Sequence, residues 1–187
     1  GDNWLLCNGE AISEEDYPEL YAIAKGFGLT PSTRDVWTGT SSYNSWINSI
    51  AYGNGYYVAV GKYYDGSSSC TARIAYATSP NGTWTTQDLW AGNSDYALRG
   101  VIYANSTWIA VGRGSSGSGQ IAYTTSLSGT WTTKTLSSLV PLGVVYANGY
   151  LLIPGKDDYV AVLGYSPESG LPEIDLPNAY AYIKALE

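Results

Sequence analysis

The pattern of hydrophobic and polar positions changes near residue 31. Between residues 13 and 24, Tyr17, Leu20 and Tyr21 recur at helical spacing. Ser13 stands where a helix needs an N-cap, and acidic residues fill the first turn, where the helix dipole favours them. We predict one helix over this stretch.

After residue 31, short runs rich in Tyr, Val, Ile, Thr and Trp are separated by Gly, Asn and Ser, which is typical of β-strands. Asn-Gly pairs occur at 54–55, 81–82 and 148–149, each between two apolar runs. Tight hairpin turns favour this pair because their central residues adopt positive φ. We therefore expect a strand reversal at each pair.

The β region repeats itself. SIAYGNGYYVAVG, which starts at Ser49, is similar to GVIYANSTWIAVG from Gly100, and IAYATSPNGTWTT from Ile74 is similar to IAYTTSLSGTWTT from Ile121. A third copy starts as GVVYANGYLLIPG at Gly143 and lacks the TWTT strand. Repeats of this length are supersecondary units that bury their apolar faces against one another.

The missing strand of the third copy has a candidate near the start of the β region. TRDVWTGTSSY from Thr33 resembles TQDLWAGNSDY from Thr86. This interpretation predicts three four-stranded antiparallel units closed into a ring, which protects the sheet edges. The units span about residues 44–90, 96–136 and 140–170, plus the strand at 33–38.

Such a ring is typical of a small β-propeller, whose blades are four-stranded antiparallel sheets of this length. Three blades are fewer than the usual four to eight. A threefold β-trefoil or β-prism, or an assembly in which chains pool their blades, also fits the repeat. The predicted fold class is thus mainly β with one amino-terminal helix.

Charge and composition narrow the choice of partners. The net charge is −7, and the nine Lys and Arg residues are scattered, so we expect neither nucleic acid nor an anionic membrane as a partner. The sequence shows no run of eighteen apolar residues and no charged-then-apolar leader, so we expect no membrane insertion and no signal peptide. Eighteen Tyr and seven Trp stand against one Phe, which suits a wet recognition surface, although Tyr also favours strands.

Catalytic and cofactor chemistry has few residues to draw on. The chain has no His and no Met, and Cys7 and Cys70 lie far apart, so we predict no metal, no cofactor and no disulfide framework. Arg73 alternates with strand residues and Arg113 lies in a Gly-Ser loop, which does not indicate the arginine cluster of a sialidase. No pair of loop carboxylates is singled out by spacing, so we predict a protein that is not an enzyme.

Two turns resemble the Asp-box of sialidase-like repeat proteins. They are SPNGTW at 79–84 and SLSGTW at 126–131, with Asn81 and Ser128 at the acidic position. In that family the Asp-box is a structural hairpin between the third and fourth strands of a blade, away from the ligand. The resemblance implies a structural role for both turns.

The two ends of the chain carry a second resemblance. WLLCNGEAISEEDYPELYAIAKGFG at 4–28 resembles the phage tail-collar domain found near the tips of tail fibres, and IDLPNAYAYIKALE at 174–187 is similar to the close of such fibre proteins. In the family these two segments lie close together, whereas here the repeats separate them. The resemblance also matches Cys7 to the family's own motif cysteine.

What the collar resemblance implies is a tail-fibre end domain with an expanded loop. The corresponding regions are a collar-like helical segment at 1–31, a three-repeat β module at 32–172 and a collar-like strand at 173–187. It further implies a homotrimer with other fibre subunits, made in the host cytoplasm and located in the tail of the virion.

In a propeller-like ring, the loops after the second strands and the connectors between units share one face, opposite the Asp-box-like turns. Aromatic rings that stack on sugars, and Asp, Asn and Arg groups that bond hydroxyls, suit a glycan, although each residue here also fits an ordinary polar loop. The candidate ligand-binding residues are Tyr43, Tyr63, Tyr64, Asp65, Asp95, Tyr96, Arg113 and Asp157. The function we expect is recognition of a bacterial surface glycan or polysaccharide by a distal receptor-binding module; the alternatives are a purely structural fibre-tip cap and a glycan depolymerase.

Overall fold

The computed structural model describes residues 15, 18, 36–37, 45–64, 70–91, 96–114, 117–136, 139–156, 158–164 and 181–184. The chain divides into two compact units, residues 1–34 and residues 35–187. In the first unit only Glu15, in a turn, and Pro18, in a helix, are described, so the rest of the helix predicted over 13–24 lies outside the described residues.

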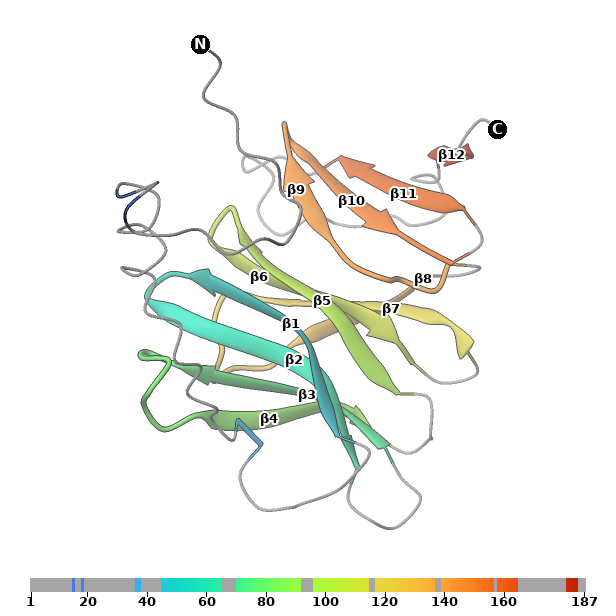
Figure 1. Ribbon diagram of the computed structural model, residues 1–187. Helices are drawn as coiled ribbons and strands as arrows, with labels where there is room; N and C mark the ends of the chain where they lie inside the picture. Colours follow the sequence, from blue (N-terminus) through green and yellow to red (C-terminus); the bar gives the residue numbers. More distant parts are fainter. Residues whose placement is uncertain are drawn as a thin grey trace. The chain divides into compact units, whose positions relative to one another are not determined.

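The second unit is built from three four-stranded antiparallel sheets that follow one another along the chain (Figure 1). The first sheet contains β1 (Trp46–Gly53), β2 (Tyr56–Tyr64), β3 (Cys70–Ala77) and β4 (Thr85–Ala91). The second sheet contains β5 (Ala97–Ala104), β6 (Thr107–Arg113), β7 (Gly119–Thr124) and β8 (Thr132–Leu136). The third sheet contains β9 (Val145–Ala147), β10 (Tyr150–Pro154), β11 (Tyr159–Gly164) and β12 (Ala181–Lys184). The prediction of a mainly β fold made of antiparallel sheets is confirmed.

The strand that completes the third sheet differs from the prediction. It is β12, from the carboxy-terminal segment, which pairs with β11 so that Val160 lies opposite Ile183. The segment predicted to be this strand, 33–38, is described at Val36 and Trp37, which form a bend and pack against the outer face of the first sheet beside Ala59. Strand β12 lacks the TWTT pattern of the other fourth strands. The repeat therefore did not predict that this segment would complete the third sheet.

The hairpin turns follow the Asn-Gly prediction in two of three cases. Asn54-Gly55 joins β1 to β2 and Asn148-Gly149 joins β9 to β10, all four residues with positive φ. The third pair, 81–82, lies in the longer turn between β3 and β4 but does not have positive φ; there the Gly82 N–H donates to the Ser79 carbonyl at 3.0 Å. The strand reversal at this pair is confirmed, but the two-residue turn is not, because seven residues (78–84) separate the strands.

The first two sheets repeat each other down to their irregularities. The register of β1 on β2 shifts at Asn48, and that of β5 on β6 shifts at the equivalent Arg99. Opposite each bulge stands a glycine, and a Cβ on Gly61 or Gly112 would overlap a carbonyl oxygen of the neighbouring strand. Glycine is therefore required where the bulged strand approaches closely.

Apolar side chains fill the spaces between consecutive sheets. Val58, Ile74 and Ala72 of the first sheet pack with Leu98 and Trp108 of the second. The opposite face of the second sheet packs on the third. The second sheet is thus covered on both faces, and its strand β6 is buried along nearly its whole length. Burial on two faces explains why this strand is a nearly continuous apolar run.

Candidate binding site at the loop end of the sheets

Every sheet has two ends that differ in how the strands are connected. One end of the sheets carries the turns at 54–55, 105–106 and 148–149, and we call it the turn end (Figure 1). The opposite end, where β2 ends and β3 begins, is the loop end. The Asp-box-like turns join β3 to β4 and β7 to β8, so they also lie at the turn end. Asn48 donates to the Leu98 carbonyl at 2.6 Å, which brings the loop ends of the first two sheets together.

The candidate residues that the structure describes all lie at the loop end. Tyr63 and Tyr64 end β2, Tyr96 stands just before β5, and Arg113 ends β6. The other four candidates, namely Tyr43, Asp65, Asp95 and Asp157, lie outside the described residues. Four of the eight candidates are thus described, and all four lie at this end; their role in binding and the convergence of the loop carboxylates stay predictions.

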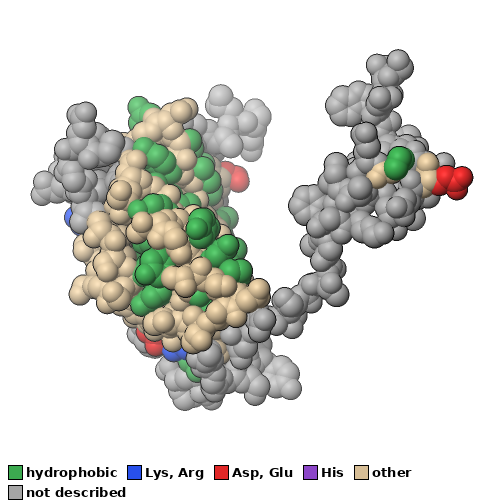
Figure 2. All heavy atoms as spheres, turned by 90° about the vertical axis from the view of Figure 1, so that its left-hand side faces the viewer, with side chains coloured by type: hydrophobic (Ala, Val, Ile, Leu, Met, Phe, Trp, Pro, Cys, Tyr) green, Lys and Arg blue, Asp and Glu red, His purple; other side chains and the backbone are tan. Residues whose placement is uncertain are grey.

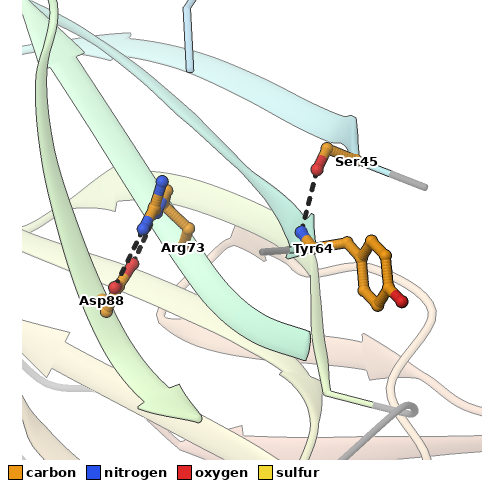
Figure 3. Close-up of polar contacts among 4 residues, drawn as sticks. All are labelled: Ser45, Tyr64, Arg73 and Asp88. Carbon is orange, nitrogen blue, oxygen red and sulfur yellow. Dashed lines mark hydrogen bonds and ion pairs between the residues drawn. The ribbon is translucent and has the colours of Figure 1, made fainter. Parts of the chain in front are cut away.

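Arg73 on β3 organises the polar contacts of this end. Its Nε donates to Oδ1 of Asp88 at 2.5 Å, and a terminal guanidinium nitrogen donates to Oδ2 at 3.0 Å, which is a bidentate pair between adjacent strands (Figure 3). The guanidinium carbon also lies 3.4 Å from the centre of the Tyr63 ring. Stacking and bidentate pairing together fix the orientation of Arg73.

The protonation of this pair follows from its surroundings. Burial lowers the pKa of Arg73, but the hydrogen bond and charge of Asp88, together with Tyr63, outweigh burial and raise the pKa above its usual value. Arg73 is therefore always charged and serves as a fixed cation. Asp88 is the more exposed partner, so its carboxylate keeps acceptor positions that face water.

Tyr64 is held through its backbone. Its N–H donates to Oγ of Ser45 at 2.8 Å, just before β1 begins. Its ring points away from the Arg73–Asp88 pair (Figure 3). Tyr63 and Tyr64 thus present their rings to different sides, and the structure does not bring them together as one stacking platform.

Trp46 is a loop-end aromatic residue that the sequence did not single out. It opens β1, is half-exposed, and lies with Lys62 Nζ 4.7 Å from its ring centre. The equivalent position in the second copy is the buried Ala97, so comparing the copies with one another could have drawn attention to Trp46. A half-exposed indole beside a cation is suited to contact with a polar ligand.

Two other loop-end candidates take part in packing between sheets. Tyr96 packs against the core between the first and second sheets. The backbone carbonyl of Arg113 accepts a hydrogen bond of 3.3 Å from the Trp90 indole of the neighbouring sheet. Both residues therefore help to hold the first two loop ends against each other.

The turn end carries a pocket. The pocket, of about 230 Å³, lies between the first two sheets, lined by residues of several turns and strands: Asn54, Tyr56, Tyr76, Trp108 and residues 125–128. Figure 2 views the molecule from the left-hand side of Figure 1. In this view hydrophobic side chains gather along the middle of the described surface, and charged ones lie near its margins. Trp84 donates to the Pro80 carbonyl at 3.4 Å, which closes the first Asp-box-like turn upon itself.

Three further findings concern the described part of the chain. Among its residues, no three or more His, Cys, Asp or Glu side chains are grouped so that they could hold a metal ion. No helix in the same residues is long and apolar enough to span a membrane. Cys70 is buried and carries a free thiol.

The chain matches no protein-family model and no curated protein. Among solved structures it is similar to the WD40 β-propeller domain of Doa1, with 12% identity and a TM-score of 0.44 over 66% of this chain and 38% of that chain. It is also similar to a Trypanosoma rangeli sialidase in complex with sialic acid, with 14% identity and a TM-score of 0.38 over 68% of this chain and 29% of that one. A third similar structure is the computationally designed Ika4 protein, with 10% identity and a TM-score of 0.33, covering 72% of this chain and 100% of that chain. The chain thus spans well under half of the first two proteins, and similarity at these levels carries no conclusion about activity.

Proposed function

We propose that the three sheets are blades of a propeller-like ring and that the loop end of this ring recognises a glycan on the bacterial surface. The sheets support the ring because each is a four-stranded antiparallel unit and the first strands β1, β5 and β9 lie next to one another in chain order. The chain then acts as a distal receptor-binding module of a phage tail fibre. This part of the proposal rests on the resemblance of residues 4–28 and 174–187 to the tail-collar family.

The observation that carries the glycan proposal is a fixed charge pair beside the Tyr63 ring, at a place where the repeats differ. Arg73 and Asp88 lie opposite each other in the first sheet, whereas the second sheet has Gln120 and Thr135 at the equivalent positions. A structural pair needed in every repeat would recur. Its presence in one copy supports a role for this pair outside the fold.

The chemistry of this place fits a polyhydroxylated ligand. The Asp88 carboxylate is oriented by two hydrogen bonds from Arg73 and remains exposed, so it can accept hydrogen bonds from sugar hydroxyls. The pair lies against the Tyr63 ring. The rings of Trp46 and Tyr64 lie at the same loop end but not on this pair, and they offer surfaces on which the C–H faces of other sugar units of a polysaccharide can pack. The proposed role is binding without catalysis.

Binding of purified host surface polysaccharide to the full chain, measured by biolayer interferometry, tests the proposal. Asp88→Asn keeps the shape of the side chain but removes its charge, and Trp46→Ala removes the ring; we expect each to weaken binding at least about tenfold. Asn81→Ala at the turn end is the matched control and should leave affinity unchanged. Equal binding by all four proteins, or no binding by any, would overturn the proposal.

The binding assay, together with chromatography of the polysaccharide after incubation, separates the two competing functions. A purely structural cap predicts that no surface polysaccharide binds, whatever the variant. A depolymerase predicts the release of shortened oligosaccharides during incubation, which chromatography of the supernatant would reveal. The proposed module predicts binding with an unchanged polymer length.

A further inference from the structure

The first and third sheets each leave one apolar face open, and the repeat shows what such a face packs against. We define the head face as the face of the first sheet turned away from the second sheet, which carries Ile47, Ile50 and Tyr52. We define the tail face as the face of the third sheet turned away from the second sheet, whose members lie on three strands: Val145, Tyr150, Leu152, Val160 and Val162. None of these residues is charged. The Arg73–Asp88 pair shares the head face but lies on the outer strands β3 and β4. Its second-sheet equivalents Gln120 and Thr135 stay at least partly exposed although that face is covered.

The part of the head face that β1 supplies has the residues of a buried interface but is exposed, whereas Ala59 and Ala75 farther out on the same face are buried. Ile50 is 59% exposed, whereas the equivalent Val101 of the second sheet is 4% exposed and packs on the first sheet. The equivalent of both in the third sheet is Val144, which is 8% exposed and packs on the second sheet. In the second and third sheets this position is covered by the sheet that precedes it in the chain. In the first sheet, the described residues that precede it in the chain cover only part of the face.

On the tail face, too, residues are exposed whose equivalents in the other sheets are buried, but there the absent neighbour is a following sheet. Val145 is 54% exposed, whereas the equivalent Ile102 packs against the core between the second and third sheets. Leu152 is likewise only partly buried, whereas its equivalents Val58 and Ile109 are fully covered by the following sheet. The tail face is therefore the surface that a following sheet would cover.

Val36 and Trp37 show that the head face accepts such a neighbour. They cover its outer part beside Ala59. In the next interface along the chain, Leu89 and Trp90 at the end of β4 likewise pack against the core between the first and second sheets. The two pairs belong to the similar stretches TRDVWTG and TQDLWAG, so Val36 and Trp37 occupy the place of a preceding sheet's last strand.

We propose that the tail face of one chain packs on the head face of a second copy, and that two copies close into one ring of six sheets. Head and tail are the two halves of the interface that already occurs twice within the chain, so the contact is heterologous and repeats the internal packing. One chain supplies three sheets, two supply six and three supply nine; only six falls within the four to eight blades typical of propellers. The inference rests on the proposed propeller-like packing but not on the glycan.

Sedimentation velocity of the full chain tests this ring. The wild type is expected to sediment with twice the chain mass of 20.0 kDa. Ile50→Glu on the head and Val145→Glu on the tail each place an unpaired charge in both interfaces, so each should raise the dissociation constant of the dimer by more than about tenfold. Thr132→Glu, an exposed position on β8, adds the same charge elsewhere and should leave the dimer intact.

Mixing the two variants distinguishes this contact from any symmetric one. A dimer of one Ile50→Glu chain and one Val145→Glu chain keeps one unaltered interface, so an equimolar mixture should regain dimers that neither variant forms alone. Both positions are exposed, so folding should persist; a thermal melt checks it, and Ile47→Glu with Tyr150→Glu is a second pair. A monomeric or trimeric wild type, or a mixture that forms no more dimer than its components, would overturn the proposal. No glycan takes part in this experiment. A failure to form the six-sheet dimer would therefore not contradict glycan binding at the loop end, and a failure to bind glycan would not contradict the dimer.

Discussion

The first and second sheets are built from nearly the same residues, yet they meet different surroundings. The second sheet is covered on both faces, and Leu98, Val101 and Trp108 are buried in the core that it shares with the first sheet. The first sheet carries Ile47, Ile50 and Tyr57 at the equivalent positions, and the two isoleucines are exposed. The comparison teaches that the apolar pattern of a repeat describes an interface, whereas burial depends on whether the neighbouring sheet is present.

The largest expected effect concerns the tryptophan that is buried in the covered interface between the first and second sheets. Trp108 is fully buried and lies 4.9 Å from the Tyr103 ring, centre to centre. Trp108→Ala should lower the free energy of unfolding by about 3–5 kcal/mol, because it leaves a cavity that the packed core cannot close. Urea denaturation of dilute protein measures it. Tyr57→Ala, the matched change on the first sheet, should cost less than half as much, and equal costs would remove the distinction between the two sheets.

A second pair compares aliphatic residues at one repeat position. Leu98→Ala should cost about 2–5 kcal/mol because the side chain is fully buried. Ile47→Ala, at the equivalent exposed position, should cost less than about 1 kcal/mol in dilute solution. Thermal unfolding of both variants at low concentration provides the comparison. If Ile47→Ala is as costly as Leu98→Ala, the head face is already covered within one chain.

A third pair sharpens the comparison at the hairpin turns. Gly55 in the first sheet has φ +78°, and the equivalent Ser106 in the second sheet has φ +60°. Gly55→Ala should cost about 1 kcal/mol because an L side chain is strained in this conformation. Ser106→Gly should stabilise the protein by about 0.5 kcal/mol for the converse reason. Opposite signs in chemical denaturation are required; a destabilising Ser106→Gly would mean that its side chain is needed.

The smallest expected effect on stability concerns the charge pair that only the first sheet has. Arg73→Gln and Asp88→Asn should each change the free energy of unfolding by less than about 1 kcal/mol, since the pair is partly exposed and screened by solvent. The two changes should nevertheless weaken polysaccharide binding. Differential scanning fluorimetry beside the binding assay checks the contrast, and a large loss of stability would identify the pair as structural.

The sequence was informative where local chemistry decides the structure. Asn-Gly pairs located hairpin turns because positive φ is a property of those residues themselves. The repeat located the strands of the first two sheets because each copy must bury the same faces. The similarity of TRDVWTG to TQDLWAG located a packing position correctly, since Val36 and Trp37 are buried against the first sheet, but misidentified it as a strand of the third sheet.

What the sequence could not predict depends on register and on distant segments. The pairing of Arg73 with Asp88 requires the register of β3 on β4, which includes a bulge after Ala72. Strand β12 is recruited from far along the chain and carries no repeat pattern. Trp46 was missed, although its equivalent in the second copy is Ala97 and this lack of repetition marks it in the same way as it marks the charge pair.

The most direct test of the claim that the two open faces are halves of one interface is a cross-link between copies. Within the chain, Tyr103 lies over Gly53 and Tyr146 packs beside Ala104, so the repeat places Tyr52 of one copy over Ala147 of another. A chain carrying both Tyr52→Cys and Ala147→Cys should form a covalent dimer with a short thiol-reactive cross-linker, read as a doubled mass by denaturing mass spectrometry. Chains with either change alone should not reach that yield. A double variant that stays at the monomer mass, or that is linked only within one chain, would contradict the account.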